Sequence, residues 1–158
     1  MGDCAGSPFF TQVAFDDFRI VLDNLNGGHR TTRNRLVPFC IFTDPELARV
    51  GMNESEAKAR GIVYRLVKLP MAAVLRTRTF SKLRGFMKLL IDAESDRILG
   101  FTAFGVEASK LLAAVQTVML GELPCTFLRD AIFTHPTIAE GLTVLLANVP
   151  AIQAQRAA

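Results

Sequence analysis

Hydrophobic positions near the start of the chain recur at helical spacing. Within residues 9–25 the charged side chains lie mostly on one side of the expected helix. The opposite side consists of Phe10, Val13, Ala14, Asp17, Ile20 and Val21. Steps of three and four residues are the period of an amphipathic helix. Pro8 suits the first turn of such a helix and Gly27-Gly28 ends it. The polar residues 27–36 that follow predict a flexible linker.

The pattern changes to mixed strand and helix after residue 36. Short apolar or alternating runs, bounded by turn residues, predict strands at 37–42, 62–69, 85–91 and 98–104. The last two are separated by the polar residues 92–97, which favours an antiparallel hairpin with a long turn. Thr43-Asp44-Pro45-Glu46 is expected to be a turn.

Helices are expected between and after these strands. Asn53 with Glu56 forms an approximate capping box for a short helix that Gly61 closes. A single apolar stripe over residues 108–119 predicts the longest helix of this part, and shorter ones follow near residues 126–130 and at 138–147. Strands clustered between helices, without regular alternation, predict an α+β fold: an antiparallel sheet with helices packed on one face.

Composition narrows the class of protein. The chain has 158 residues, half of them apolar and 21% charged, which suits a folded domain with its own core. No apolar stretch approaches the roughly 20 residues that span a bilayer, and no leader is apparent, so we expect no membrane partner. The three cysteines are far apart, which favours a reducing, cytoplasmic location. A net charge of +3, without aromatic residues beside the basic residues 29–35, does not favour nucleic acid as a partner.

Candidate chemistry is concentrated near residue 135. Two distant histidines and scattered cysteines offer no metal site, and the glycine-rich fingerprints for phosphates and dinucleotides are missing. His135 lies just before the last predicted helix, with Glu140 expected inside its first turns. A carboxylate beside an imidazole orients the ring for acid/base work. A helix-capping histidine with a solvated glutamate remains the alternative. The cysteines are expected to be inert and partly buried.

Two separate motifs resemble a known family. Val37-Pro38 with the run at residues 42–51 (FTDPELARVG) resembles the opening of the C-terminal dimerisation domain of FAD-dependent pyridine nucleotide-disulfide oxidoreductases. This family includes mercuric reductase, dihydrolipoamide dehydrogenase and glutathione reductase. His135-Pro136-Thr137 with Glu140 matches the His-Pro-Thr-x-x-Glu signature of the same domain. The resemblance covers about residues 37–148.

The beginning of the chain is similar to the last segment of the FAD domain of the same family. The matching residues are Gly2-Asp3, Gly6 and the run at 11–14 (TQVA). The resemblance implies that Asp3 contacts the ribityl chain of FAD and that the Phe10 and Thr11 amides face the flavin ring. With His135, which approaches from the partner subunit, these are the expected cofactor-binding residues. Residues 1–26 are thus expected to be an FAD-domain remnant, 27–36 a linker and 37–158 the dimerisation domain.

The resemblance also implies a function. His135, oriented by Glu140, is the expected catalytic acid/base for redox-active thiols of the partner subunit in a homodimer. The parent enzyme would pass electrons from NAD(P)H through FAD to a small-molecule or protein disulfide. The family's C-x-x-x-x-C pair is missing from this sequence. We therefore expect this chain by itself to be inactive and to bind no cofactor. A homodimerisation or interaction module without catalysis is the alternative.

Overall fold

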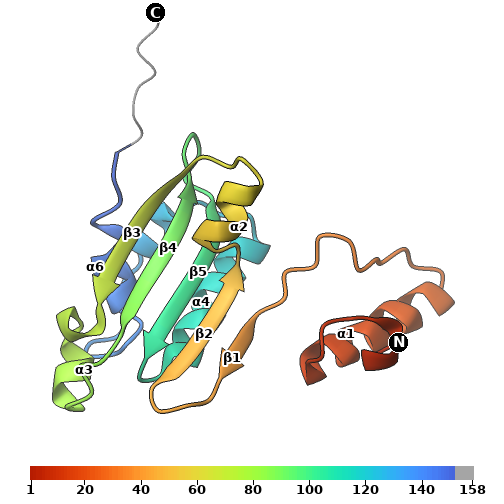
Figure 1. Cartoon of the computed structure of the whole chain (residues 1–158), viewed down its shortest axis with the longest axis horizontal. Helices are drawn as coiled ribbons and strands as arrows, with labels where there is room; N and C mark the ends of the chain where they lie inside the picture. The colour runs from red at the N-terminus through yellow and green to blue at the C-terminus, as the bar shows by residue number, and fades with distance from the viewer. Residues whose placement is uncertain (152–158) are drawn as a thin grey trace, which may run out of the picture. The chain divides into compact units, whose positions relative to one another are not determined.

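Five strands form one sheet in the order β1-β2-β5-β4-β3 (Figure 1). The structure, a computed structural model, describes residues 1–151, so the last seven residues of the predicted dimerisation domain lie outside the described residues. The strands are β1 (Phe39–Ile41), β2 (Glu46–Gly51), β3 (Tyr64–Pro70), β4 (Phe86–Asp92) and β5 (Ile98–Gly105). The pairs β2/β5, β5/β4 and β4/β3 are all antiparallel. The predicted hairpin of β4 and β5 is confirmed.

The strand register places apolar side chains in rows on one face of the sheet. Cα pairing puts Val50 opposite Phe101, Phe101 opposite Leu89, and Leu89 opposite Val67. All four are buried, as are the members of the next row: Ala48, Ala103, Met87 and Leu69. Successive side chains of a strand point to opposite faces, so these rows belong to one face. That face of the sheet forms one side of the hydrophobic core.

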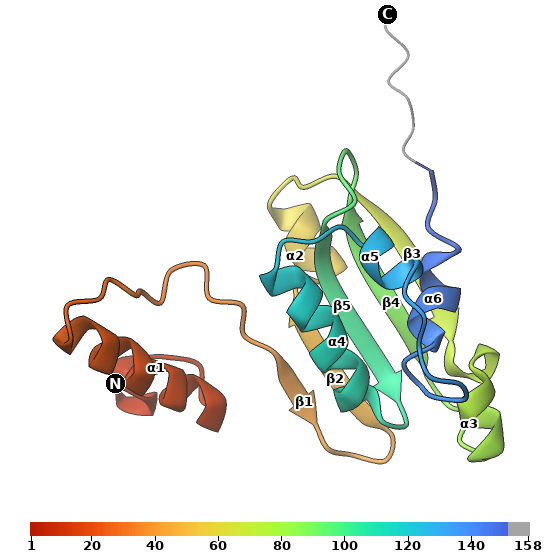
Figure 2. The same ribbon diagram turned by 180° about the vertical axis from the view of Figure 1, so that it is seen from behind.

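Three helices cover this face of the sheet: α4 (Ala108–Leu120), α5 (Thr126–Arg129) and α6 (Gly141–Leu146) (Figure 2). Their buried side chains include Leu111, Val115, Leu128, Leu142 and Leu145. Each such side chain contributes about 1.5–3 kcal/mol when it leaves water. The α+β class, an antiparallel sheet with helices packed on one face, is therefore confirmed.

The short helix α2 (Glu54–Ala59) lies apart from the other three. It has the predicted capping box: the Asn53 side chain accepts from the Glu56 amide, and the Glu56 carboxylate accepts from the Asn53 amide. Glu54 and Glu56 form ion pairs with Lys88 and Arg49. Lys88 and Arg49 alternate with the buried residues of β4 and β2, so they point to the face opposite the main helices.

The first residues form a separate unit, Met1–Phe39, and the second unit begins at Cys40. In the first unit a 3₁₀ turn, η1 (Asp3–Ala5), precedes helix α1 (Thr11–Leu25). The predicted helix is confirmed, but it begins at Thr11. Its buried residues are Val13, Asp17 and Ile20, whereas Val21 is exposed.

Asp17 organises this first unit. Its Oδ2 accepts from the Gly2 amide at 2.8 Å and from the Ser7 hydroxyl at 2.9 Å, and Arg35 Nη1 donates to its Oδ1 at 2.6 Å. These hydrogen bonds lower the pKa of Asp17 from 3.8 to about 2, and the bond from Arg35 has the largest effect. One buried carboxylate thus connects the start of the chain, helix α1 and the segment after it.

Some elements differ from the expectations. Strand β2 occupies residues for which we expected no strand, and residues 71–79 form a 3₁₀ turn, η2 (Met71–Ala73), and a short helix, α3 (Leu75–Thr79). The last helix begins at Gly141, three residues later than predicted. The expected strand over 37–42 is shorter, because only Phe39–Ile41 pairs with the sheet.

The Asp17 contacts predict a pH-dependent first unit. Because folding lowers this pKa, the carboxylate stabilises the unit above pH of about 4, and that contribution is lost as the pH falls through about 2. We expect the NMR signal of the Gly2 amide, which donates to Asp17, to titrate with a midpoint near pH 2. Asp17→Asn abolishes this titration, whereas Asp44→Asn in the second unit does not. A midpoint near the ordinary value of 3.8 contradicts the assignment.

Candidate active site

His135 and Glu140 meet on the loop between α5 and α6. His135 Nδ1 lies 3.0 Å from Glu140 Oε2, and the peptide bond from His135 to Pro136 is cis. The side chain of His135 is 67% exposed, whereas that of Glu140 is 21% exposed. An ionised carboxylate only accepts hydrogen bonds, so this contact favours the imidazole tautomer with its proton on Nδ1. Nε2 is then the ring nitrogen that can accept a proton, on a side chain that is largely exposed.

The core fixes the backbone beneath this pair. Ile138 and Leu142 are buried on either side of Glu140. Gly141 begins α6 at a point where a Cβ would lie 2.7 Å from Val74 Cγ2 and 3.0 Å from Met87 Cε. The absence of a side chain at Gly141 therefore allows the start of α6 to lie against Val74 and Met87. Glu140 directly precedes α6, so the expectation that it lies inside the first turns is wrong.

The other predicted site residues belong to the first unit. Asp3 is exposed within η1, and the Phe10 amide donates to the Pro8 carbonyl at 2.8 Å. Helix α1 has no side-chain cap and no acidic residue in its first turn. Within residues 1–151, the Thr11 and Gln12 amides have no hydrogen-bond acceptor. The positive end of α1 is therefore open to an electron-rich group.

The cysteines differ in their surroundings. Burial raises the pKa of Cys125 and, together with the charge of Glu46, that of Cys40. Both are therefore poor thiolates at neutral pH. Cys4 is exposed, so the expectation that it is partly buried is wrong. The part of the chain that the structure describes contains no group of three or more His, Cys, Asp or Glu side chains that could hold a metal ion.

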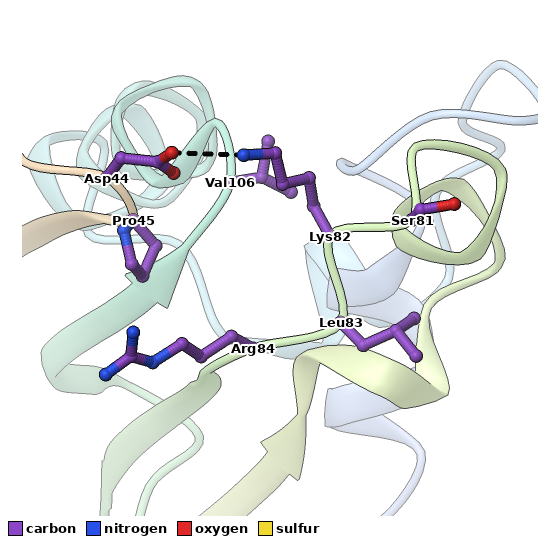
Figure 3. A pocket seen from close by; sticks show the side chains of 7 residues that line it. All are labelled: Asp44, Pro45, Ser81, Lys82, Leu83, Arg84 and Val106. Carbon is purple, nitrogen blue, oxygen red and sulfur yellow. Dashed lines mark hydrogen bonds and ion pairs between the residues drawn. The ribbon is translucent and has the colours of Figure 1, made fainter.

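A shallow hollow of about 210 Å³ lies elsewhere on the second unit (Figure 3). It is lined by Asp44, Pro45, Ser81, Lys82, Leu83, Arg84 and Val106. Lys82 Nζ is 3.0 Å from Asp44 Oδ2, so these two charges largely offset each other. None of the predicted site residues lines the hollow.

The sequence analysis assigned no structural role to two supporting residues, Asp17 and Thr137. Asp17 occupies an apolar position of the predicted helix, and a carboxylate in such a place signals a buried acceptor. Thr137 Oγ donates to the Thr134 carbonyl at 2.7 Å, inside the same loop as His135. The sequence feature that indicates this role is the spacing Thr137-x-x-Glu140, which is typical of a helix N-terminus.

Fold and site together define an α+β domain that presents an exposed histidine, held by a glutamate, on a loop between two short helices. The family model of the pyridine nucleotide-disulphide oxidoreductase dimerisation domain matches residues 37–146. The chain therefore belongs to this family. Among helices within residues 1–151, none is both long and apolar enough to cross a membrane.

Curated relatives are longer oxidoreductases. The probable pyridine nucleotide-disulfide oxidoreductase RclA of Escherichia coli K12 is 41% identical over 151 residues, which are 94% of this chain and 34% of the relative. Mercuric reductase of Shigella flexneri is 32% identical over 141 residues, 89% of this chain and 25% of the relative. The chain thus spans about a third or less of the length of these relatives.

One solved structure agrees with this assignment, and a second shares the fold. The HOCl-induced flavoprotein disulfide reductase RclA from Escherichia coli superposes with a TM-score of 0.90 at 41% identity, over 95% of this chain and 35% of that one. LpdA from Mycobacterium tuberculosis has a TM-score of 0.85 at 24% identity, over 92% of this chain and 32% of that one. The second comparison supports the fold alone.

The cysteine environments predict a clear order of reactivity. In the native chain at pH 7, iodoacetamide should modify exposed Cys4 first, and Cys40 and Cys125 much more slowly, because burial disfavours their thiolates. Peptide mass spectrometry measures the three rates. In urea the three rates should converge, and Cys4→Ser should remove the fast phase. Modification of Cys125 as fast as Cys4 would show that this account of the thiols is wrong.

Proposed function

We propose that this chain is the dimerisation part of a flavin-dependent disulfide oxidoreductase. In this proposal His135 is the acid/base group for redox-active thiols of the partner subunit, and Glu140 orients it. The single observation on which the proposal depends is the exposed imidazole whose Nδ1 is 3.0 Å from Glu140 Oε2. Membership of the dimerisation-domain family supports the homodimer.

The geometry suits proton exchange with a group outside the unit. With the Nδ1 proton held by Glu140, Nε2 accepts a proton from an attacking thiol and returns it to a leaving thiolate. Imidazole is the side chain that exchanges protons near neutral pH. Glu140 stabilises the imidazolium that forms in between, because its carboxylate is already in contact with the ring.

The reacting thiols have to come from another part of the enzyme. Within the described residues, the ring of His135 makes its only hydrogen bond with Glu140. Burial also raises the pKa of Cys40 and Cys125, which makes them unsuitable as nucleophiles. An exposed histidine without a thiol of its own is consistent with a role across a twofold interface.

The first unit fits a flavin in its chemistry. Asp3 offers an exposed carboxylate for a hydroxyl of the ribityl chain, and the open end of α1 offers the Thr11 and Gln12 amides. The Phe10 amide, also expected to face the ring, is bonded to Pro8 in this structure. FAD, when bound, would supply electron transfer between NAD(P)H and the disulfide. All three cysteines are free, which suits a reducing compartment such as the cytoplasm.

The proposal predicts a dimer whose interface includes the loop that precedes His135. The side chain of Ile132 on this loop is fully exposed in the single chain. We expect the chain to sediment as a dimer at tens of micromolar. Ile132→Asp should remove about 1.5–3 kcal/mol of apolar burial and raise the dimer Kd about tenfold or more. A monomeric wild-type chain, or an Ile132→Asp chain that dimerises equally well, counts against the proposed interface.

A chimera tests the proton-transfer role. In it, this chain replaces the aligned third of Escherichia coli RclA, a relative with 41% identity. His135→Ala should lower NAD(P)H-dependent disulfide reduction by ~10²–10⁴-fold, the usual contribution of a general acid/base. The flavin absorbance should not change. His29→Ala, which alters the other histidine, is the matched control.

The result is decisive in both directions. If the parent chimera is active and His135→Ala leaves turnover unchanged, His135 is not the acid/base group. If both histidine variants lose activity equally, the loss is not specific to the site.

A further inference from the structure

Thr137 bridges the two ends of the loop that holds the site. Its hydroxyl donates to the Thr134 carbonyl at 2.7 Å and accepts from the Glu140 amide at 3.4 Å. Thr134 directly precedes His135, and Glu140 is the partner of His135. One hydroxyl therefore connects the backbone before the imidazole to the backbone of the carboxylate that orients it.

The spacing Thr137-x-x-Glu140 is that of a capping box, and the same chain contains a complete one for comparison. In α2, the Asn53 side chain accepts from the Glu56 amide at 2.8 Å, and the Glu56 carboxylate accepts from the Asn53 amide at 2.7 Å. Before α6 only the first half is formed. The Glu140 carboxylate lies instead on His135 Nδ1. Thr137 thus holds the glutamate backbone while the carboxylate remains available to the imidazole.

A second threonine fixes Glu140 from the other side. Thr143 Oγ donates to the Glu140 carbonyl at 2.7 Å. The backbone of Glu140 is therefore bonded at both its amide and its carbonyl. Thr143 acts from within α6, whereas Thr137 alone also binds the residue next to His135.

We propose that Thr137 is a positioning residue for the His135–Glu140 pair. Its hydroxyl fixes the separation of the two residues and so determines which imidazole nitrogen holds the proton. This inference depends on the proposed function for its catalytic meaning. Whether Thr137 controls the tautomer of His135 can be measured on this chain, without the rest of the enzyme.

The experiment uses the full chain with ¹⁵N-labelled histidine. Long-range ¹H–¹⁵N NMR gives the Nδ1 and Nε2 shifts, which report the tautomer, and His29→Gln assigns the two histidines. Glu140→Ala, which removes the acceptor altogether, sets the size of the effect when the contact with His135 is lost. Thr137→Val should produce most of that change, because it removes the hydroxyl at nearly constant shape. Thr137→Ser, which retains the hydroxyl, should restore the wild-type shifts.

Thr134→Val is the matched control, since it removes a hydroxyl from the same loop and Thr134 donates no side-chain hydrogen bond within residues 1–151. It should leave the His135 shifts unchanged. The backbone amide spectrum shows whether each variant is folded, and Thr137→Ala replaces Thr137→Val if the latter is not. A purely structural role would lower the unfolding temperature without moving the tautomer.

Each outcome decides the matter. If Glu140→Ala moves the His135 shifts and Thr137→Val does not, Thr137 is not a positioning residue, and the proposed function is untouched. If Thr134→Val moves them as much as Thr137→Val, the effect is a general loosening of the loop and the proposal is overturned. If Glu140→Ala itself has no effect, the His135–Glu140 contact is absent in solution. The proposed function then fails together with the inference.

Discussion

The packing of α6 against the sheet is the constraint on which the candidate site depends. A Cβ on Gly141 would lie 2.7 Å from Val74 Cγ2, which is too close, and 3.0 Å from Met87 Cε, which is tight. Interiors are packed like molecular crystals, so this contact fixes the start of α6 to within small displacements. Glu140 is the residue just before it, and the carboxylate therefore has a defined position toward His135. The exposed His135–Glu140 pair is thus attached to a point of the backbone that the buried Gly141 holds in place.

Carboxylates serve repeatedly in this chain as fixed acceptors. Asp17 binds two segments of the first unit to α1, and Glu56 completes the cap of α2. Glu46 of β2 accepts from both the amide and the hydroxyl of Ser109 in the first turn of α4. Glu140 has the same chemistry but holds an imidazole in place of a backbone amide. The candidate site thus uses the same kind of carboxylate hydrogen bond that stabilises the rest of this fold, with an imidazole as the donor.

The proposal that His135 acts on thiols of the partner subunit follows from the reactive groups of the second unit. Its histidine is exposed and oriented, whereas burial raises the pKa of Cys40 and Cys125. A proton-transfer group without a nucleophile is useful only in an assembly that supplies one. In the proposed parent enzyme a homodimer would supply that assembly, with the reactive thiols on a part of the partner subunit that this chain does not include.

The sequence by itself determined the elements whose signals are local. The stripe over residues 108–119, the Asn53–Glu56 box and the β4/β5 hairpin all depend on neighbours within a few residues, and the structure has them nearly as predicted. Only the tertiary structure decided β2, because Arg49 and Glu46 interrupt its apolar pattern and find their partners in α2 and α4. It also decided the start of α6 and the contact of His135 with Glu140. These depend on the fit of Gly141 against side chains more than 50 residues away, and spacing along the chain does not specify such a fit.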